Sequence, residues 1–379
     1  MQTILKPPII AKAEGLNSSQ EIEEELSNTV GDLLENLDLN GIDKLYDDEF
    51  NIFGNTSFKE KVHDLINGKY FDNYDNVFSA IMSLVFEGIS ALLPIFLTII
   101  AIAILSSILN NIKADSKNNL SQIVNFVCFA VVITIISVNF KNVIVTTSNC
   151  LNIMKSQMDA IFPIILTLIS AIGGTVSVSI FKPVVAILSN WISALFSNLL
   201  LPMFIISFLF TIIGSLSPNV KLNKFNSFLS STFKWIVGFV FTIFSAFLAI
   251  QGISAGKYDG VSIKASKFAI KTYIPIIGGY LSEGLDFIML GSILIKNAIG
   301  VCGLIILFIT ILSPLIQIVV FKLGLQLVAG IIEPTNNNEM SNLINGCSKV
   351  LIFPIVLILG VAFMYIISIS LLMCTVSLV

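Results

Sequence analysis

The sequence predicts an all-α protein, a polytopic transmembrane helical bundle preceded by a small acidic helical region outside the membrane. Hydrophobic residues make up 55% of the 379 residues and charged residues only 12%, whereas a soluble domain carries about 25% charged residues. Several runs of about 18 residues or more are almost free of charge, which is typical of transmembrane helices. These runs lack the period-two alternation of a membrane β-barrel. Because lipid offers no hydrogen bonds to free backbone groups, helices are the predicted elements and membrane lipid is the predicted surrounding.

Residues 1–78 form the acidic region. They hold 16 acidic residues and 6 lysines, while residues 79–379 hold 8 acidic residues and 15 lysines. Lysine-rich loops tend to stay in the cytoplasm, but an acidic domain is free to cross the membrane. We therefore expect residues 1–78 to be extracytoplasmic. Ala11-Lys12-Ala13 has the small-x-small form of a cleavage site, but the residues before it include no apolar stretch of adequate length, so we expect that most of a signal peptide has been removed.

Two helices are predicted within this acidic region. Ser18 and Glu21 fit a capping box, and Ser57 and Glu60 fit a second one. Apolar residues follow each box at spacings of three or four, at Ile22, Leu26, Val30, Leu33 and Leu37 and then at Phe58, Val62, Leu65 and Ile66. Two roles stay open for the region: a solvated helical cap, or a docking surface for a basic partner.

The membrane domain, residues 79–379, contains eight apolar runs. In chain order they are 79–109, 120–140, 159–180, 183–216, 235–253, 272–295, 297–332 and 350–377. The fourth run has no charged residue between Pro183 and Val220. A straight helix of that length would reach about 50 Å, while the hydrocarbon core is about 30 Å thick. We therefore predict that this run is kinked or divided.

Prolines mark the predicted interruptions of these helices. Pro94, Pro202 and Pro314 each lie at the entry to an apolar run, separated by 108 and 112 residues. Pro163 and Pro275, in "IFPIILTLIS" and "YIPIIGGYLS", are also 112 residues apart. Proline removes one hydrogen bond of the helix, and only packed neighbours or a watery cavity can take up the freed groups in a membrane. We predict that these five prolines are helix breaks at packed or pore-lining positions.

The recurring spacing predicts an internal repeat. The repeat-like units span about 79–140, 150–253 and 262–377. An odd number of membrane crossings per unit would invert alternate copies, and an even number would keep them parallel. The lysine content of the loops does not decide between the two.

A few charged residues fall within or beside the apolar runs. Glu283 and Asp286 in "YLSEGLDFIML" are three residues apart, which places both on one helix face. Carboxylates at membrane depth are costly and face a cavity or a partner. Two interpretations stay open: a polar lining paired with lysines such as Lys271 or Lys296, or a wet position near the interface. The candidate intramembrane polar residues are Glu283, Asp286, Glu87 and Lys322.

The motifs of common enzyme classes are missing from the sequence. There is one histidine, and we find no H-E-x-x-H, no G-x-x-x-x-G-K-[ST] and no G-x-S-x-G. The five cysteines are scattered and show no metal-ligand spacing. We expect a protein that is not an enzyme, with no catalytic residue, no cofactor, no metal and no nucleic-acid partner.

The stretch from 252 to 301 carries a resemblance. It reads "GISAGKYDGVSIKASKFAIKTYIPIIGGYLSEGLDFIMLGSILIKNAIGV", and "FEGISALLP" at 86–94 and "FKP" at 181–183 accompany it. With these segments the whole chain resembles the stage III sporulation protein AE family of endospore-forming bacteria. The resemblance implies a multi-pass protein of the mother-cell membrane, with its N-terminal region between the mother-cell and forespore membranes. It also implies partners among other sporulation channel subunits, including ring-forming proteins.

Two functions follow as hypotheses. The first is a non-enzymatic membrane subunit of a channel or secretion-like complex between mother cell and forespore, assembled with other subunits or as a homo-oligomer. The second is a secondary transporter whose midplane site is formed by broken helices near Pro202 and Pro314. A transporter needs a closed polar site within one chain, whereas an assembly subunit needs a flank that partners cover.

Overall fold

The computed structural model describes residues 26, 29–35, 37, 58–66, 74–112, 120–187, 193–216, 222–273, 278–335 and 337–375. Within these ranges every regular element is helical, which confirms the predicted all-α class. A short helical segment, 29–35, comes first. The elements that follow are α3 (Phe58–Ile66), α4 (Tyr74–Ile112), α5 (Leu120–Ala171), α6 (Thr175–Ile187), α7 (Ser193–Leu195), the π-helix η4 (Phe196–Leu200), α8 (Leu201–Leu216), α9 (Asn223–Tyr273), α10 (Gly278–Ile332), the 3-10 helix η5 (Glu333–Thr335), α11 (Asn338–Val350) and α12 (Ile352–Cys374).

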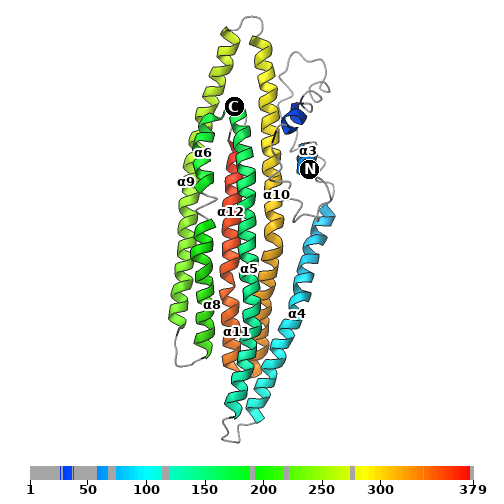
Figure 1. Ribbon diagram of the computed structural model, residues 1–379, viewed down its shortest axis with the longest axis vertical. Helices are drawn as coiled ribbons and strands as arrows, with labels where there is room; N and C mark the ends of the chain where they lie inside the picture. The colour runs from blue at the N-terminus through cyan, green and yellow to red at the C-terminus, as the bar shows by residue number, and fades with distance from the viewer. Residues whose placement is uncertain are drawn as a thin grey trace.

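The long helices run up and down in an elongated bundle (Figure 1). In that view α4 runs downward and α5 upward, α6 and α8 together run downward and α9 upward, and α10 runs downward before α11 and α12 return upward. Six segments of the described chain are long and apolar enough to cross a membrane: Ile81–Ile108, Phe126–Ala171, Phe196–Ser215, Lys224–Ala246, Gly284–Thr335 and Asn338–Cys374. The chain is therefore a multi-pass membrane protein by length and composition. Because the number of crossings is even, the start of α4 and the end of α12 lie on the same side of the membrane.

Six spans replace the eight apolar runs of the sequence prediction. The runs 120–140 and 159–180 both fall largely in α5, and most of 272–295 joins 297–332 in α10. The charges that separate the runs do not end the helices, because a charged side chain can lie on the surface of the helix or form hydrogen bonds with a neighbouring helix. Lys141 lies exposed on the surface of α5, and Lys296 caps another helix, as described below.

The predicted helix breaks at three prolines are wrong. The helices α4, α5 and α10 continue through Pro94, Pro163 and Pro314. A proline removes one hydrogen bond from a helix, but the helix can continue when the other backbone groups stay bonded. In lipid, where an unpaired backbone group is costly, this continuation is favoured. Close by, the hydroxyl groups of Thr98 and Thr167 donate to the carbonyls of Pro94 and Pro163, at 2.7 and 2.8 Å.

The interruption of the run 183–216 lies before Pro202. Here α6 ends at Ile187, residues 188–192 lie outside the described residues, and the π-helix η4 leads directly into α8. The Leu201 N–H donates to the Phe196 carbonyl, five residues back. The wider turn ends where Pro202, which has no N–H to offer, takes the second place of α8. The fifth candidate, Pro275, lies outside the described residues.

Helix α10 is the centre of the bundle. It packs against α3, α4, α5, α9, α11 and α12. Stacked aromatic rings fill the core beside it: the ring centroid of Phe140 lies 3.7 Å from that of Phe208, 5.6 Å from that of Phe204 and 6.1 Å from that of Phe321. Aromatic rings at these distances pack directly against one another, so the core at this level of the bundle is apolar.

The two helices of the acidic region dock on the upper part of α10. Phe58 and Val62 of α3 are fully buried, as are Val30 and Leu34 in the segment 29–35. A Cβ on Gly291 of α10 would lie 3.1 Å from Leu33 Cδ1, so the glycine lets this segment approach closely. The predicted apolar face of α3 is confirmed. Ser18 and Glu21, the first capping box, lie outside the described residues.

Candidate functional site

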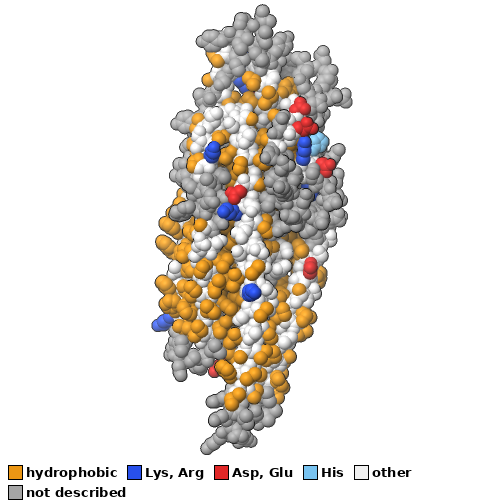
Figure 2. Space-filling view, viewed as in Figure 1, with side chains coloured by type: hydrophobic (Ala, Val, Ile, Leu, Met, Phe, Trp, Pro, Cys, Tyr) orange, Lys and Arg blue, Asp and Glu red, His pale blue; other side chains and the backbone are white. Residues whose placement is uncertain are grey.

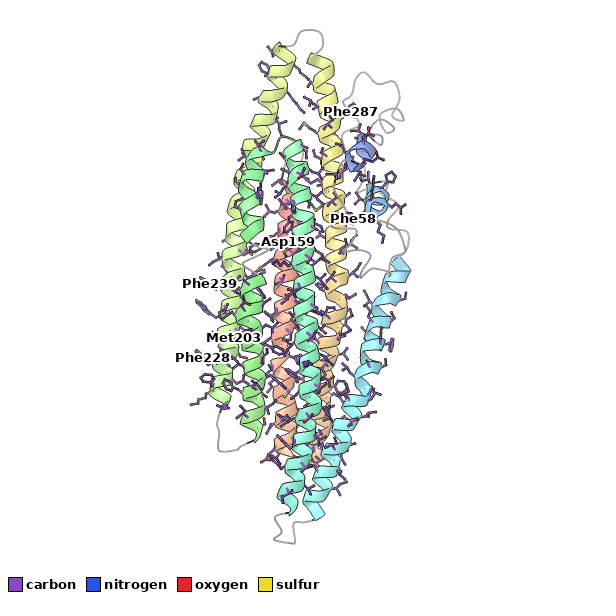
Figure 3. All side chains as sticks on the ribbon, in the orientation of Figure 1. Phe58, Asp159, Met203, Phe228, Phe239 and Phe287 are labelled. Carbon is purple, nitrogen blue, oxygen red and sulfur yellow. The ribbon has the colours of Figure 1, made fainter. Side chains whose placement is uncertain are left out.

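A broad apolar band covers the lower half of the bundle on the face seen in Figure 2. Figure 2 shows hydrophobic side chains gathered there. The large exposed side chains include Phe86, Leu93, Leu97, Leu105, Phe126, Val131, Val138, Phe225, Phe228, Trp235 and Phe239. Phe228 and Phe239 point away from the bundle (Figure 3). An apolar belt of this size on several neighbouring helices is the surface that lipid covers.

The upper ends of α9 and α10 reach beyond the other helices (Figure 1). The end of α12 lies level with Lys296, and α10 begins at Gly278, 18 residues earlier. At 1.5 Å per residue this extension is about 27 Å long. Within this extension, we call residues 264–273 of α9 and 278–290 of α10 the arm.

An ion pair joins the two helices of the arm. Lys267 Nζ contacts Asp286 Oδ1, and both side chains are partly exposed. Lys264, Phe268 and Lys271 are exposed on α9. The backbone of Glu283 belongs to α10, but its side chain lies outside the described residues. Asp286 therefore pairs with Lys267.

Glu87 and Lys322 lie elsewhere in the bundle. The Glu87 side chain is exposed on α4. Lys322 is half-buried, and its carbonyl accepts a hydrogen bond of 3.0 Å from Ser348 Oγ of α11. Along α10, Asp286 and Lys322 are 36 residues apart, or about 54 Å. The structure does not bring these two candidates together.

Lys296 closes the upper end of α12. Its side chain is fully buried, and Nζ donates to the carbonyls of Met373 and Thr375 at 2.9 and 2.5 Å. The last carbonyls of a helix have no partner within it and carry partial negative charge. A lysine from α10 therefore satisfies the C-terminus of α12 from outside.

Asp259 caps the upper end of α6, which is a helix N-terminus, whereas Lys296 caps a helix C-terminus. This fully buried carboxylate on α9 accepts from the Val176 and Ser177 N–H groups, both at 3.0 Å. The turn before α6 contains Gly173 at φ +92°, a conformation that favours glycine. A negative charge at free N–H groups is the favourable pairing for a helix start. Asp259 and Lys296 thus fix the level at which α6 begins and α12 ends.

Replacing Asp259 with alanine should destabilise the α5–α6 turn by about 1–2 kcal/mol, since two N–H groups lose their acceptor. Asp259→Asn keeps one side-chain oxygen as an acceptor, so its loss of stability should be smaller than that of Asp259→Ala. Thermal unfolding of the detergent-solubilised protein measures both. Equal stability of Asp259→Ala and the wild type would contradict the capping role.

A buried polar pair joins α5 and α10 beside Pro314. Gln157 Nε2 donates to Thr310 Oγ1 at 2.7 Å, and both side chains are buried. The Thr310 carbonyl is the one that Pro314 leaves without its helical partner, and Cys150 Sγ lies 3.9 Å from it as a weak donor. Gln157 was not among the predicted sites, although an uncharged polar residue inside an apolar helix was a signal for it.

Lys61 lies on the buried face of α3. Lys61 is 4% exposed, and burial lowers the pKa of Lys61 below its ordinary value of 10.5. Because the docked state disfavours the charged form, docking should strengthen as the pH rises from the lowered pKa towards 10.5.

The docking of α3 should strengthen as the pH rises from the lowered pKa of Lys61 towards 10.5, and Lys61→Met should remove this pH dependence because methionine does not titrate. Amide hydrogen exchange of α3 measures the effect, and Lys59→Met, at a half-buried position on the same helix, is the control that keeps it. The same pH dependence in Lys61→Met and in the wild type would contradict this role of Lys61.

The described residues contain no group of three or more His, Cys, Asp or Glu side chains that could hold a metal ion. The cysteines are free, with Cys128, Cys150, Cys302 and Cys347 buried and Cys374 exposed.

Comparisons with known proteins match most of the chain. The model of a family described as "Stage III sporulation protein AE" matches residues 56–376. The protein named "Stage III sporulation protein AE" from Bacillus subtilis (strain 168) is 24% identical over 315 residues, which cover 83% of this chain and 79% of the relative. No solved structure matches the chain.

Proposed function

Because this chain belongs to the stage III sporulation protein AE family and so has a role in sporulation, we propose that it is a non-enzymatic membrane subunit of a channel or secretion-like complex between mother cell and forespore. In this proposal the lower bundle spans the mother-cell membrane. The arm, the segment 29–35 and α3 lie outside the cytoplasm, where other subunits bind.

The arm is the observation that carries the proposal. Helices α5, α9 and α10 have 52, 51 and 55 residues, more than twice the roughly 20 that a bilayer requires. A protein that acts only within the membrane does not need helices that extend about 27 Å beyond their neighbours. Exposed lysines beside an exposed Phe268 form a surface on which acidic and apolar groups of a partner fit.

The proposal predicts that Lys264→Glu/Phe268→Ser abolishes assembly without removing the protein from the membrane. Lys224→Glu/Phe228→Ser is a matched control, because the same two residue types are exposed with the same spacing at the other end of α9. Co-purification of the other complex subunits from sporulating cells, together with the spore yield, measures the effect. Normal co-purification and spore yield in the arm variant would overturn the proposal.

A secondary transporter is the second candidate, favoured by the buried Gln157–Thr310 pair beside Pro314. A transporter works as a single protein in a sealed vesicle, whereas a channel subunit requires its complex. Solute uptake by vesicles that hold this chain alone, lost in Gln157→Leu, would replace the first proposal with the second.

A further inference from the structure

Two buried polar atoms in the core lack hydrogen-bond partners. Gln157 is 2% exposed and Tyr365 of α12 is fully buried. Within the described residues neither Gln157 Oε1 nor the Tyr365 hydroxyl makes a hydrogen bond. A buried polar group without a partner costs about 1–3 kcal/mol, and native proteins meet such groups with ordered water.

The two atoms belong to one layer of the bundle. A Cβ on Gly303 of α10 would lie 3.1 Å from both Ile161 Cδ1 and Ile369 Cδ1, so α5, α10 and α12 converge there. Gln157 and Tyr365 each precede one of these isoleucines by four residues, which places them on the same helix faces one turn away. Because α5 and α12 run in the same direction (Figure 1), both residues lie on the same side of Gly303.

Side-chain direction brings the polar ends towards Thr310. Helical side chains lean towards the N-terminus of their helix, which is the lower end for both α5 and α12. Thr310 lies seven residues below Gly303 on the descending helix α10 and already bonds Gln157. The rings of Tyr365 and Phe162 pack edge to face with centroids 5.6 Å apart, which holds Tyr365 against α5.

We propose that one buried water molecule binds between Gln157 Oε1, the Tyr365 hydroxyl and the Thr310 carbonyl. Water donates two hydrogen bonds, one to each of the two carbonyl-type oxygens. It accepts one from the tyrosine hydroxyl, so every polar group of the layer is satisfied. The water replaces the helical bond that Pro314 removes, which accounts for an α10 that continues through its proline.

The charges around the layer favour water over a cation. Lys155, two residues from Gln157, is half-buried, and Asp159 of the same helix is exposed. Among the described residues, no buried carboxylate lies on α5, α10 or α12. A cation in an apolar core without a carboxylate is costly, while a neutral water needs only the three polar partners.

Radiolytic hydroxyl-radical labelling of the full-length protein in lipid nanodiscs tests the site. Radicals formed from a bound water oxidise the aromatic ring beside it, so Tyr365 should be labelled in spite of its complete burial. Phe140, fully buried among aromatic rings, should stay unlabelled after correction for intrinsic reactivity. Gln157→Leu removes one partner of the water, and the labelling of Tyr365 should be lost.

Two results would overturn the proposal. The first is an unlabelled Tyr365 in the wild type, which means that the layer is dry or that the tyrosine bonds Gln157 directly. The second is equal labelling of Tyr365 in the wild type and the variant, which means that the radicals come from elsewhere. Gln157→Met, which nearly conserves volume, replaces Gln157→Leu if the latter fails to fold, and the wild-type result stands without either variant.

Discussion

Lys296→Ala should destabilise the protein by about 3–5 kcal/mol, the largest effect that we expect of any single substitution. The change leaves the carbonyls of Met373 and Thr375 without their donor in a buried place. It also opens a cavity where the lysine stem was, since Lys296 is among the largest fully buried side chains.

The comparison that isolates this effect is Lys349→Ala, a lysine exposed on α11. Its loss should change stability by less than about 0.5 kcal/mol. Chemical unfolding in detergent measures both variants, and hydrogen exchange should show the end of α12 opening first in Lys296→Ala. If the two alanine variants unfold alike, Lys296 does not hold the end of α12.

Gly324→Val should separate α4 from α10 and destabilise the protein by about 1–3 kcal/mol. A Cβ at Gly324 would lie 2.0 Å from Cζ and 2.2 Å from Cε2 of Phe96. Phe96 is held by stacking on Phe321, with ring centroids 6.2 Å apart. The ring must therefore move, and because it stacks on Phe321 we expect α4 to move with it.

Gly330 supplies the matched control, because a Cβ there meets nothing within 4 Å. Gly330→Val on the same helix should leave the packing of α4 unchanged. Spin labels on α4 and α10 report the separation, and Phe96→Ala should restore the contact in Gly324→Val. An unchanged distance between α4 and α10 in Gly324→Val would show that this close approach does not determine their packing.

The membrane helices could be predicted because a helix that crosses lipid needs a long run of apolar residues, which the sequence shows directly. Their number could not be predicted from charge alone. Lys141 and Asp159 separate two apolar runs in the sequence, yet both lie exposed on the surface of one continuous helix. A charge ends an apolar run in the sequence, but it does not end a helix whose charged face is turned outward.

The prolines were overestimated as breaks for a related reason. The rule that proline removes a hydrogen bond is sound, but at Pro314 the response depends on a neighbour far away in the chain. That neighbour is α5, whose Cys150 Sγ lies near the Thr310 carbonyl and whose Gln157 bonds the Thr310 hydroxyl. The repeat predicted from proline spacing stays a prediction, although Pro94, Pro202 and Pro314 all fall in helices that run downward in Figure 1.

The helix caps lay beyond sequence analysis altogether. Asp259 and its two N–H partners are separated by 83 and 82 residues, and Lys296 and the carbonyls it bonds by 77 and 79. Nothing local marks either residue, because each caps a helix other than its own. By contrast, the apolar face of α3 is a local pattern, and it could be predicted and then confirmed.

Our central proposal is that lipid covers the lower bundle while the arm lies outside the cytoplasm. Single cysteines at Thr272 in the arm and Glu339 at the start of α11, both exposed positions, test it after Cys374→Ser removes the exposed native thiol. A membrane-impermeant thiol reagent should label Thr272→Cys in intact vegetative cells that express the protein, and Glu339→Cys only after permeabilisation. Labelling of both cysteines from the same side of the membrane would contradict the account.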